Sequence, residues 1–453
     1  MRRWLKQNLA ALITVLSAIL LAFLGGMTVG HLRLGPDVLV SHAIAAIDDL
    51  KENGQAYFLG KPVGHLRPLR FERTGIVVAD AARAAPGVTL VTGLFGNKLG
   101  ARLYGTDGTL LYEWPTNFFE VAPDEMAFPF DALIHGDALY PNGDIVVNLD
   151  GRALMRVSAC GEIRWQNRDR SHHAIFIDEA GFIWTPTSAP EYHEPRLVGE
   201  PFRFDRVAKF DPATGRKVDE IDLVEVLVEA EAQGLALSNR PKPEDMMHLN
   251  DVEVLSSAIA SRFPAFAAGD IMLSSRQFNQ LWVLDGQSHA LKWWQAGPMV
   301  GQHDPDFQPD GTITLFDNRP SGGATPQNGY RSDFGGSRIL ELDPQTRAYR
   351  TLYASSERNV FYSPYRGKHQ MLANGNILIT ETDAGRAFEV TPQGDIVWSF
   401  VNGWDEDEAG WLMSATRYPP DHAAIGKTVC PSARSAARAL HRATASPNEA
   451  LQA

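Results

Sequence analysis

The chain has 453 residues, of which 44% are hydrophobic and 21% charged, and it contains 39 glycines and 28 prolines. This composition excludes a disordered chain and a collagen-like repeat, and it supplies enough apolar side chains for a sizeable core. The formal net charge of −12 repels a phosphate backbone, so we expect no nucleic acid as a partner.

The first 35 residues have the pattern of a membrane anchor. Arg2, Arg3 and Lys6 precede an uncharged stretch from Leu9 to Gly30, which at ~1.5 Å per residue can cross the ~30 Å apolar layer of a bilayer. A cleaved signal peptide is the alternative, but the stretch is long for one and lacks an Ala-x-Ala site near its end. We predict an N-terminal transmembrane helix within residues 1–35, in a single-pass protein of the inner (cytoplasmic) membrane. The basic flank stays inside, so the body lies on the periplasmic or extracellular side.

A short motif recurs along the rest of the chain. It has the form Gly-x-Ile, in which a glycine turn leads into an apolar strand. The copies are Gly143-Asp144-Ile145, Gly181-Phe182-Ile183, Gly269-Asp270-Ile271, Gly311-Thr312-Ile313 and Gly375-Asn376-Ile377, with Gly87-Val88-Thr89 as a weaker sixth. Alternating apolar strands around a short polar turn follow each copy, which is typical of β-hairpins. The predicted hairpins span residues 102–114, 154–165, 207–221, 281–294, 339–353 and 387–398.

Six units of this kind favour radial stacking, because none is large enough to bury a sheet face alone. The predicted fold class is therefore all-β, a six-bladed β-propeller over residues 65–426 with short helical insertions. Residues 222–234 have the acidic and Leu/Val spacing of one such helix. A parallel α/β fold is disfavoured, since helical patterns do not alternate with the strands.

A missing motif limits the chemistry. The chain has no phosphate-binding loop of the Gly-x-x-x-x-Gly-Lys-Ser/Thr or Gly-x-Gly-x-x-Gly type, so we expect no nucleotide cofactor.

The C-terminal segment has a different composition. Residues 427–453 have little that could form a core, and we predict a disordered tail there. Cys160 and Cys430 are the two cysteines. An oxidising compartment permits them to pair, and the sequence leaves this open.

Several histidines occupy one phase of the repeat. His135, His173 and His303 each lie eight residues before the glycine of their Gly-x-Ile turn, and His248 has an analogous place before the next apolar stretch. His369 lies only six residues before its glycine. Because blades are related by rotation about a central axis, we expect histidines of one phase to converge at the mouth of the central channel. Two other roles stay open, namely hydrogen bonds to the backbone at each turn and binding of zinc or copper.

At this point the sequence resembles a known family. Segments in register from about Gly87 to Tyr418 are similar to the arylsulfotransferases, the bacterial arylsulfate sulfotransferases that do not use PAPS. The matching segments are Ser171-His172-His173-Ala174, His248-Leu249-Asn250-Asp251, Ser274-Ser275-Arg276, Gly301-Gln302-His303-Asp304, Phe316-Asp317-Asn318, Asn374-Gly375-Asn376 and Ala415-Thr416-Arg417-Tyr418. The resemblance implies a six-bladed propeller that moves a sulfuryl group from an aryl sulfate ester to a phenol through a sulfohistidine. It implies no cofactor and no metal, with phenolic sulfate esters and phenols as small-molecule partners.

The resemblance also assigns roles. His303 would be the nucleophile, and His248, His173 and Arg276 the other catalytic residues. Asn250 would bind the substrate, and we expect His172 and His369 to contact it as well. The chemistry suits these residues, because a neutral imidazole is a good nucleophile near pH 7 and a guanidinium holds sulfuryl oxygens. Either His173 or His248 could act as general acid and base.

The sequence departs from the family at two places. Arg319 follows Asp317-Asn318 where the family more often has glycine, and His369 stands where we expect another residue type. Two further functions therefore remain as alternatives. One is a membrane-tethered, non-catalytic propeller that binds an anionic or glycan ligand. The other is a metal-dependent hydrolase that uses the histidine cluster.

Overall fold

The computed structural model describes residues 17, 19–26, 54–56, 58–122, 130–197, 201–232, 245–320, 332, 334–422 and 430. The chain divides into two units, Met1–Gly64 and His65–Ala453. In the first unit, residues 19–26 and 54–56 are helical. Among the described residues, no helix is both long and apolar enough to span a membrane. Most of the anchor predicted at residues 1–35, and all of the tail predicted at 427–453 except Cys430, lie outside the described residues.

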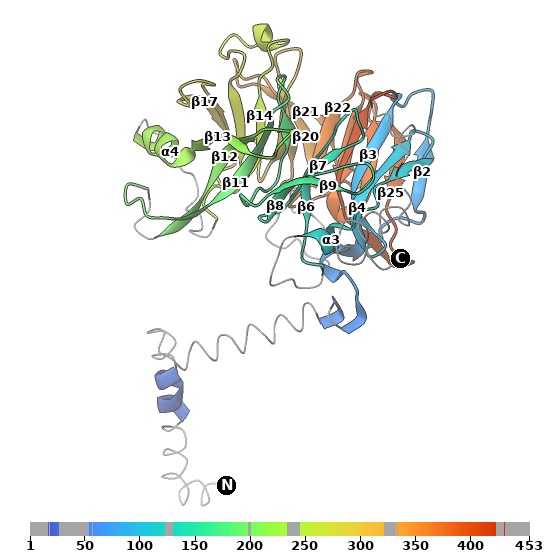
Figure 1. The fold of residues 1–453 in the computed structure, drawn as a ribbon, viewed down its shortest axis with the longest axis horizontal. Coiled ribbons are helices and arrows are strands. Elements are labelled where there is room, and N and C mark those ends of the chain that lie inside the picture. Colours follow the sequence, from blue (N-terminus) through green and yellow to red (C-terminus); the bar gives the residue numbers. More distant parts are fainter. Residues whose placement is uncertain are drawn as a thin grey trace, which may run out of the picture. The chain divides into compact units, whose positions relative to one another are not determined.

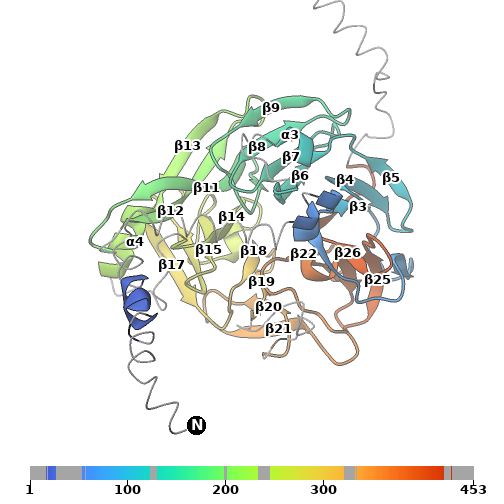
Figure 2. The same cartoon turned by 90° about the horizontal axis from the view of Figure 1, so that it is seen from below.

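The described part of the second unit forms six antiparallel sheets of four or five strands around one axis (Figures 1 and 2). From the axis outward, the first three sheets consist of β27 (Leu412–Tyr418), β3 (Val88–Phe95), β4 (Lys98–Gly105) and β5 (Leu110–Glu113); β6 (Ile134–Leu139), β7 (Ile145–Leu149), β8 (Ala153–Val157) and β9 (Ile163–Asn167); and β10 (Phe176–Ile177), β11 (Ile183–Tyr192), β12 (Phe202–Phe210) and β13 (Lys217–Asp222).

The other three sheets follow the same order around the ring. They consist of β14 (Leu249–Val254), β15 (Ile271–Ser275), β16 (Gln280–Leu284) and β17 (Leu291–Ala296); β18 (His303–Phe307), β19 (Ile313–Asp317), β20 (Arg338–Leu342) and β21 (Tyr349–Ala354); and β22 (Lys368–Met371), β23 (Ile377–Glu381), β24 (Arg386–Val390), β25 (Ile396–Val401) and β2 (Gly75–Ala79). This arrangement confirms the predicted all-β propeller of six blades.

The sequence motifs have one structural meaning in every blade. Each Gly-x-Ile turn leads into the second strand, as Ile145 does in β7 and Ile313 in β19. Each predicted hairpin forms the third and fourth strands, for example β8 with β9. The helix predicted at 222–234 is confirmed as α4 (Leu223–Ala232), which lies at the periphery of the ring (Figures 1 and 2).

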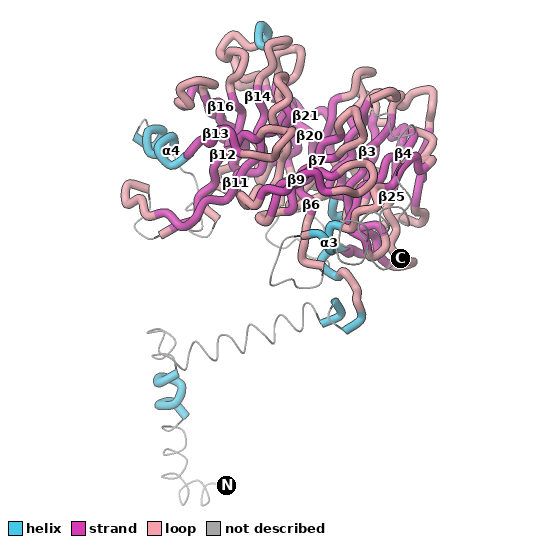
Figure 3. The backbone as a smooth tube through the Cα atoms, viewed as in Figure 1, coloured by secondary structure: helices cyan, strands magenta, loops and turns pink. Residues whose placement is uncertain are grey.

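Strands far apart in the sequence close the ring. β27 pairs with β3 as the innermost strand of the first blade, and β2 pairs with β25 as the outermost strand of the last. A small two-stranded sheet joins β1 (Leu66–Pro68) to β26 (Glu408–Gly410). Strands dominate the described part of this unit, with α3 (Phe118–Val121), α4 and the short 3₁₀ turns η2 (Ala260–Arg262) and η4 (Thr382–Ala384) beside them (Figure 3). A further 3₁₀ turn, η1 (Val63–His65), begins in the first unit and ends at His65.

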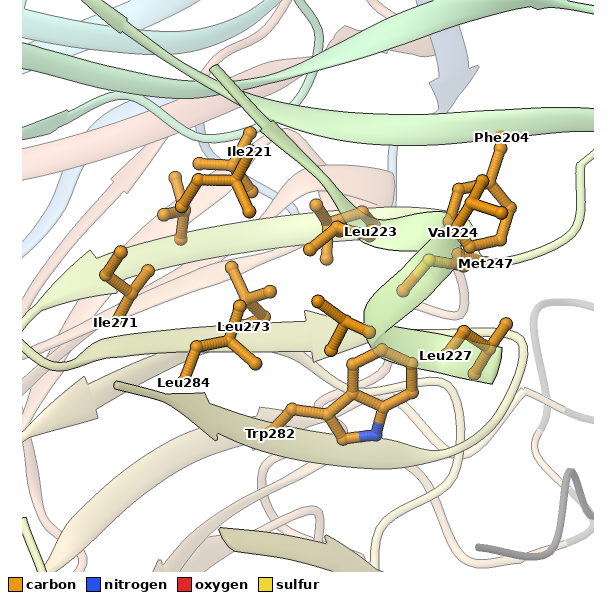
Figure 4. Close-up of a cluster of buried hydrophobic side chains, with 14 of the residues drawn as sticks. Phe204, Ile221, Leu223, Val224, Leu227, Met247, Ile271, Leu273, Trp282 and Leu284 are labelled. Carbon is orange, nitrogen blue, oxygen red and sulfur yellow. The ribbon is translucent and has the colours of Figure 1, made fainter. Parts of the chain in front are cut away.

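The hydrophobic core lies between neighbouring blades. In the largest cluster, side chains of β13 and α4 such as Ile221 and Leu227 pack against Leu273 and Trp282 of the next blade (Figure 4). Full burial of an aliphatic or aromatic side chain contributes about 1.5–3 kcal/mol. Packing of this kind fixes each blade at a set angle to its neighbours, and so it fixes where the inner strands begin.

Candidate active site

Equivalent positions of different blades meet at one mouth of the central channel. His303 is the first residue of β18, His135 is the second residue of β6, and His248 immediately precedes β14. His173 lies three residues before β10. The inner strands surround the axis (Figure 2), so their first residues face a common space.

A β-bulge turns side chains into this space in four of the inner strands. In β6, β14 and β27 one residue has no partner on the second strand, and these residues are His135, Asn250 and Met413. In β18 the register shifts between His303 and Asp306. A bulge inserts an extra residue and redirects its side chain. The recurrence of bulges at one end of the inner strands explains why polar side chains collect there.

The backbone is strained at the same place. His173 and His248 have φ values of 54° and 48°, in the left-handed region that non-glycine residues adopt infrequently. Asn148 is fully buried and holds this region, since its amide donates to the His173 carbonyl at 2.7 Å and accepts from the Gly136 N–H at 2.9 Å. Strain of this kind is concentrated at functional sites.

The imidazole rings lie in contact. The ring centroids of His135 and His173 are 3.8 Å apart, and those of His173 and His248 are 4.8 Å apart. The His303 ring lies 6.4 Å from His173. Arg276 joins the cluster from the end of β15, where its backbone N–H donates to the His248 carbonyl at 3.1 Å. The structure therefore brings together the four residues predicted as catalytic.

One hydrogen-bond network fixes the tautomer of His303. The Asn318 amide nitrogen donates to two carbonyls, those of Ser363 at 2.7 Å and Arg366 at 2.8 Å, so its oxygen must face His303. That oxygen lies 2.7 Å from His303 Nδ1, which also lies 3.1 Å from the Gly301 carbonyl. Both neighbours of Nδ1 are acceptors, so Nδ1 carries the proton. The other nitrogen, Nε2, is buried, has no partner among the described residues and keeps its lone pair.

Burial keeps this ring neutral. Burial and the nearby charge of Arg276 hold the pKa of His303 well below its usual range. Burial and the neighbouring rings of His135 and His248 likewise hold the pKa of His173 well below its usual range. The site thus contains two imidazoles that stay uncharged near neutral pH.

The other histidines of the cluster have carboxylate partners. His248 Nδ1 lies 2.6 Å from Asp245, and His172 Nε2 lies 3.3 Å from Asp205. Burial disfavours the His172 cation, but the Asp205 carboxylate outweighs this effect and raises the pKa of His172. His172 Nδ1 lies 2.9 Å from His173 Nδ1, so a hydrogen bond joins the two rings.

Four of the predicted site residues are not among the described residues that line the cavity at this mouth: His248 and Arg276, predicted as catalytic, and His172 and His369, predicted to contact substrate. His172 lies behind His173. His369 is the second residue of β22 and points to β18, where its ring nitrogens lie 3.1 Å from Asp304 and 2.7 Å from Thr314. The cavity has a volume of about 20 Å³, and its described lining residues are His135, His173, Ala174, Asn250, His303, Asp304, Arg366, Gly367, Lys368 and Met413.

The size of this cavity limits what enters it. A volume of about 20 Å³ holds one water-sized group, so there is room for a reacting oxygen while an aromatic ring stays at the mouth. A larger cavity of about 790 Å³ lies near β2, β25 and residues 355–360. It has no imidazole among its described lining residues, and we therefore place the candidate site at the histidine cluster.

Two groups of side chains have ligand atoms close enough for a metal ion. They are His135, Asp150 and His173, and, deeper in the channel, Asp304, Asp306 and His369. In the first group the His135 and His173 Nδ1 atoms already face Asp150 and His172. In the second, His369 and Lys368 already face Asp304. Asp306 lies 3.6 Å from His369 Nε2. Most ligand atoms of both groups thus already have partners within the protein.

Sequence reasoning did not assign several functional side chains. His135 shares the eight-residue phase and could have been found from it. Asn318 was noted only as part of a segment, because its role depends on the carbonyls of a neighbouring blade. Arg366 has no signal in the repeat, since it lies in the segment that leads into β22.

Fold and site together define a β-propeller with a polar, histidine-lined channel mouth. The sequence profile of the arylsulfotransferase (ASST) family matches residues 136–403, which is more than half of the chain. The chain belongs to this family. The matched range contains His173, His248, Arg276 and His303. A separate comparison of the chain with curated proteins found no match.

The comparison with solved structures finds matches of low sequence identity. A protein of unknown function from Bacteroides caccae has a TM-score of 0.47 and 9% identity over 73% of this chain and 98% of its own. A streptogramin B lyase has a TM-score of 0.39 and 13% identity over 75% of this chain and 88% of its own. TolB from Acinetobacter baumannii has a TM-score of 0.42 and 11% identity over 74% of this chain and 67% of its own.

Proposed function

We propose that this protein transfers a sulfuryl group from an aryl sulfate ester to a phenol, without PAPS, through a sulfohistidine at His303. The observation that carries the proposal is the tautomer of His303. Its Nδ1–H donates to Asn318, its Nε2 has no hydrogen-bond partner among the described residues, and the ring lines the cavity. Membership of the arylsulfotransferase family supports the same class of reaction.

The first half-reaction divides a difficult displacement into two steps. His303 Nε2 attacks the sulfur, an N–S bond forms, and the bond from sulfur to the aryl oxygen breaks. The three terminal oxygens keep their negative charge, and Arg276 and the second amide hydrogen of Asn250 are donors for them. Asn250 uses its other amide hydrogen in a 2.6 Å bond to the Gln302 carbonyl, which fixes its side chain.

The leaving phenolate takes up a proton, and we assign this proton to His248. Its Nδ1 lies 2.6 Å from Asp245, whose carboxylate balances the imidazolium, as the buried carboxylate does in other carboxylate–histidine pairs. In the second half-reaction the neutral His248 takes the proton of the acceptor phenol. The phenol oxygen attacks sulfur, the N–S bond breaks and His303 is regenerated. The sum consumes one ester and one phenol and yields one phenol and one ester.

We also propose where this reaction takes place. The basic and apolar N-terminal sequence supports a single-pass anchor in the inner membrane, with the propeller on the outer side. A disulfide between Cys160 and Cys430 supports an oxidising compartment. A donor that is itself a sulfate ester suits such a compartment, because it supplies the sulfuryl group without a cytosolic nucleotide.

The test is incubation with 4-nitrophenyl sulfate and phenol. We expect wild type to release nitrophenol and form phenyl sulfate, and His303→Ala to lose at least about 10³-fold in kcat. The matched control is His193→Ala, which changes an exposed histidine outside the cavity and keeps wild-type turnover. Mass spectrometry of the wild type quenched without acceptor should find an acid-labile mass of one sulfuryl group on His303. Equal turnover by wild type and His303→Ala contradicts the proposal.

A metal-dependent hydrolase remains a second candidate, because His135, Asp150 and His173 have ligand atoms within 4.8 Å of one another. It predicts stoichiometric metal in purified protein and loss of activity on chelation. A non-catalytic binding propeller predicts saturable binding of sulfate esters with neither nitrophenol release nor a sulfated histidine.

A further inference from the structure

The candidate site contains two guanidinium groups whose nearest carboxylate charges are not in ion-pair contact with them. Asp245 acts on Arg276, and Asp383 and Asp150 act on Arg366, each through space. Among the described residues, the side chains of Arg276 and Arg366 form no ion pair with a carboxylate, and the Nε atom of each is buried without a hydrogen-bond partner. Lys368, the other cation of the cavity, lies 3.4 Å from Asp304. Four other arginines of low exposure have carboxylate partners: Arg156 with Asp144, Arg338 with Asp317, Arg386 with Glu381 and Arg417 with Glu389. A desolvated, unpaired guanidinium is costly unless an anion completes it.

The two guanidiniums approach the histidines from different sides. Arg276 follows β15 and lies beside Gly301. After burial, its charge is the second-largest cause of the lowered pKa of His303. Arg366 precedes β22 and lines the cavity together with His135 and Met413. The charge of Arg366 helps to lower the pKa values of His135 and Asp150. One group therefore acts on the proposed nucleophile, while the other acts on His135 and Asp150.

Arg366 is held in a fixed orientation. Its guanidinium carbon lies 4.3 Å from the centre of the Trp411 ring, which is 6% exposed, and its backbone carbonyl accepts from Asn318. A planar guanidinium stacked on an aromatic face presents its N–H groups as a fork that matches a carboxylate. Arg366 is therefore organised to bind an anion with directional hydrogen bonds.

The charges of the proposed reaction leave Arg366 without a partner. An aryl sulfate monoester carries one negative charge, and Arg276 beside His303 matches it. We propose, on the basis of the sulfuryl transfer above, that Arg366 binds a carboxylate on the aromatic ring of the substrate. The preferred substrates are then phenols and aryl sulfates with a ring carboxylate. Their hydroxyl or ester oxygen enters the small cavity, while the ring and its carboxylate stay at the mouth, where the carboxylate meets Arg366.

The experiment compares two acceptors of nearly equal shape, 4-hydroxybenzoate and the neutral 4-hydroxybenzamide, with 4-nitrophenyl sulfate as donor. The readout is the ratio of their kcat/KM values in each variant. We expect Arg366→Gln to lower the benzoate-to-benzamide ratio at least about tenfold from its wild-type value, and Arg366→Lys to lower it less, because lysine keeps the charge but not the fork. Arg350→Gln, which changes an exposed arginine paired with Glu341, is the matched control and keeps the ratio.

If Arg366→Gln keeps the wild-type benzoate-to-benzamide ratio, the inference is overturned, even if both rates fall. Arg366 would then act on the sulfuryl group of every substrate. Nitrophenol release with the neutral acceptor reports the proposed function separately. Should wild type transfer no sulfuryl group, calorimetric titration with 4-hydroxybenzoate still tests Arg366. We expect wild type to bind it at least about tenfold more tightly than Arg366→Gln, and equal Kd values overturn the inference. Circular dichroism checks that each variant is folded.

Discussion

The charge of Arg276 has a consequence for the pH dependence of His303. In the proposed mechanism neutral His303 is the nucleophile. The first half-reaction should therefore slow when the pH falls through the pKa of His303, which burial and Arg276 hold well below 6.5. Arg276→Met removes the positive charge but leaves the burial. We expect the acid limb of kcat/KM for nitrophenol release to move to higher pH. We also expect kcat at pH 7 to fall about 10²-fold, because the variant loses a hydrogen-bond donor to the sulfuryl oxygens.

The measurement is a pH profile from 4 to 8 with alkaline quenching, run on wild type, Arg276→Met and Arg350→Gln. Arg350 lies on the exposed face of a blade with Glu341 and should leave the profile unchanged. An acid limb at the same pH in wild type and Arg276→Met shows that the charge of Arg276 does not act on His303.

At this scale the sequence predicts residue types better than their states. The common phase of His135, His173 and His303 indicates that they converge, because rotation relates the blades. The protonation of His303 depends on Asn318, whose orientation is fixed by two carbonyls of the segment that leads into β22. Nothing near His303 in the sequence encodes those contacts. His369 lies on the same inner strand as the cavity residue Lys368, and strand alternation turns it towards Thr314 instead.

The strand is the element that positions the site, and its bulges are essential to it. A Cβ atom added at Gly136 would lie 2.3 Å from the His173 carbonyl and 2.9 Å from the Ile175 nitrogen, which are both backbone atoms. Gly136→Ala must therefore push β6 away from the segment that carries His173. We expect a loss of about 1–3 kcal/mol in the free energy of unfolding. We also expect kcat to fall about tenfold or more, because His135 and His173 separate.

Urea unfolding and nitrophenol release measure the two effects in one preparation. The matched control is Gly64→Ala, since an added Cβ at Gly64 meets no atom within 4 Å. Wild-type stability and turnover in Gly136→Ala contradict the close approach of the two segments.

Elements were predicted well where their signal is local. Hairpins such as 154–165 and 387–398 are read from alternation and turn residues, and they form β8 with β9 and β24 with β25. The bulges were not predicted. A bulge is a mismatch between two strands, and neither strand by itself shows which of its residues lacks a partner.

The closure of the whole ring depends on pairs that are remote in sequence. β27 joins β3, and β2 joins β25, across separations of more than 300 residues. The repeat predicts six blades, but it does not say which terminal strands complete the first and the last. Those pairings arise because an open ring would leave a sheet edge and a blade face uncovered.

A disulfide adds a further remote link, between Cys160 at the β8–β9 turn and Cys430 near the C-terminus. The two residues are 270 positions apart, so the bond removes a large amount of chain entropy from the unfolded state. Neither cysteine lines the histidine cavity. We expect Cys160→Ser to lower the free energy of unfolding by about 2–5 kcal/mol and to leave kcat within about twofold of wild type.

Urea unfolding of wild type with and without dithiothreitol, beside Cys160→Ser, measures this effect. Reductant should destabilise wild type to the level of the variant and leave the variant unchanged. A wild type that is insensitive to reductant contradicts a stabilising role for this bond.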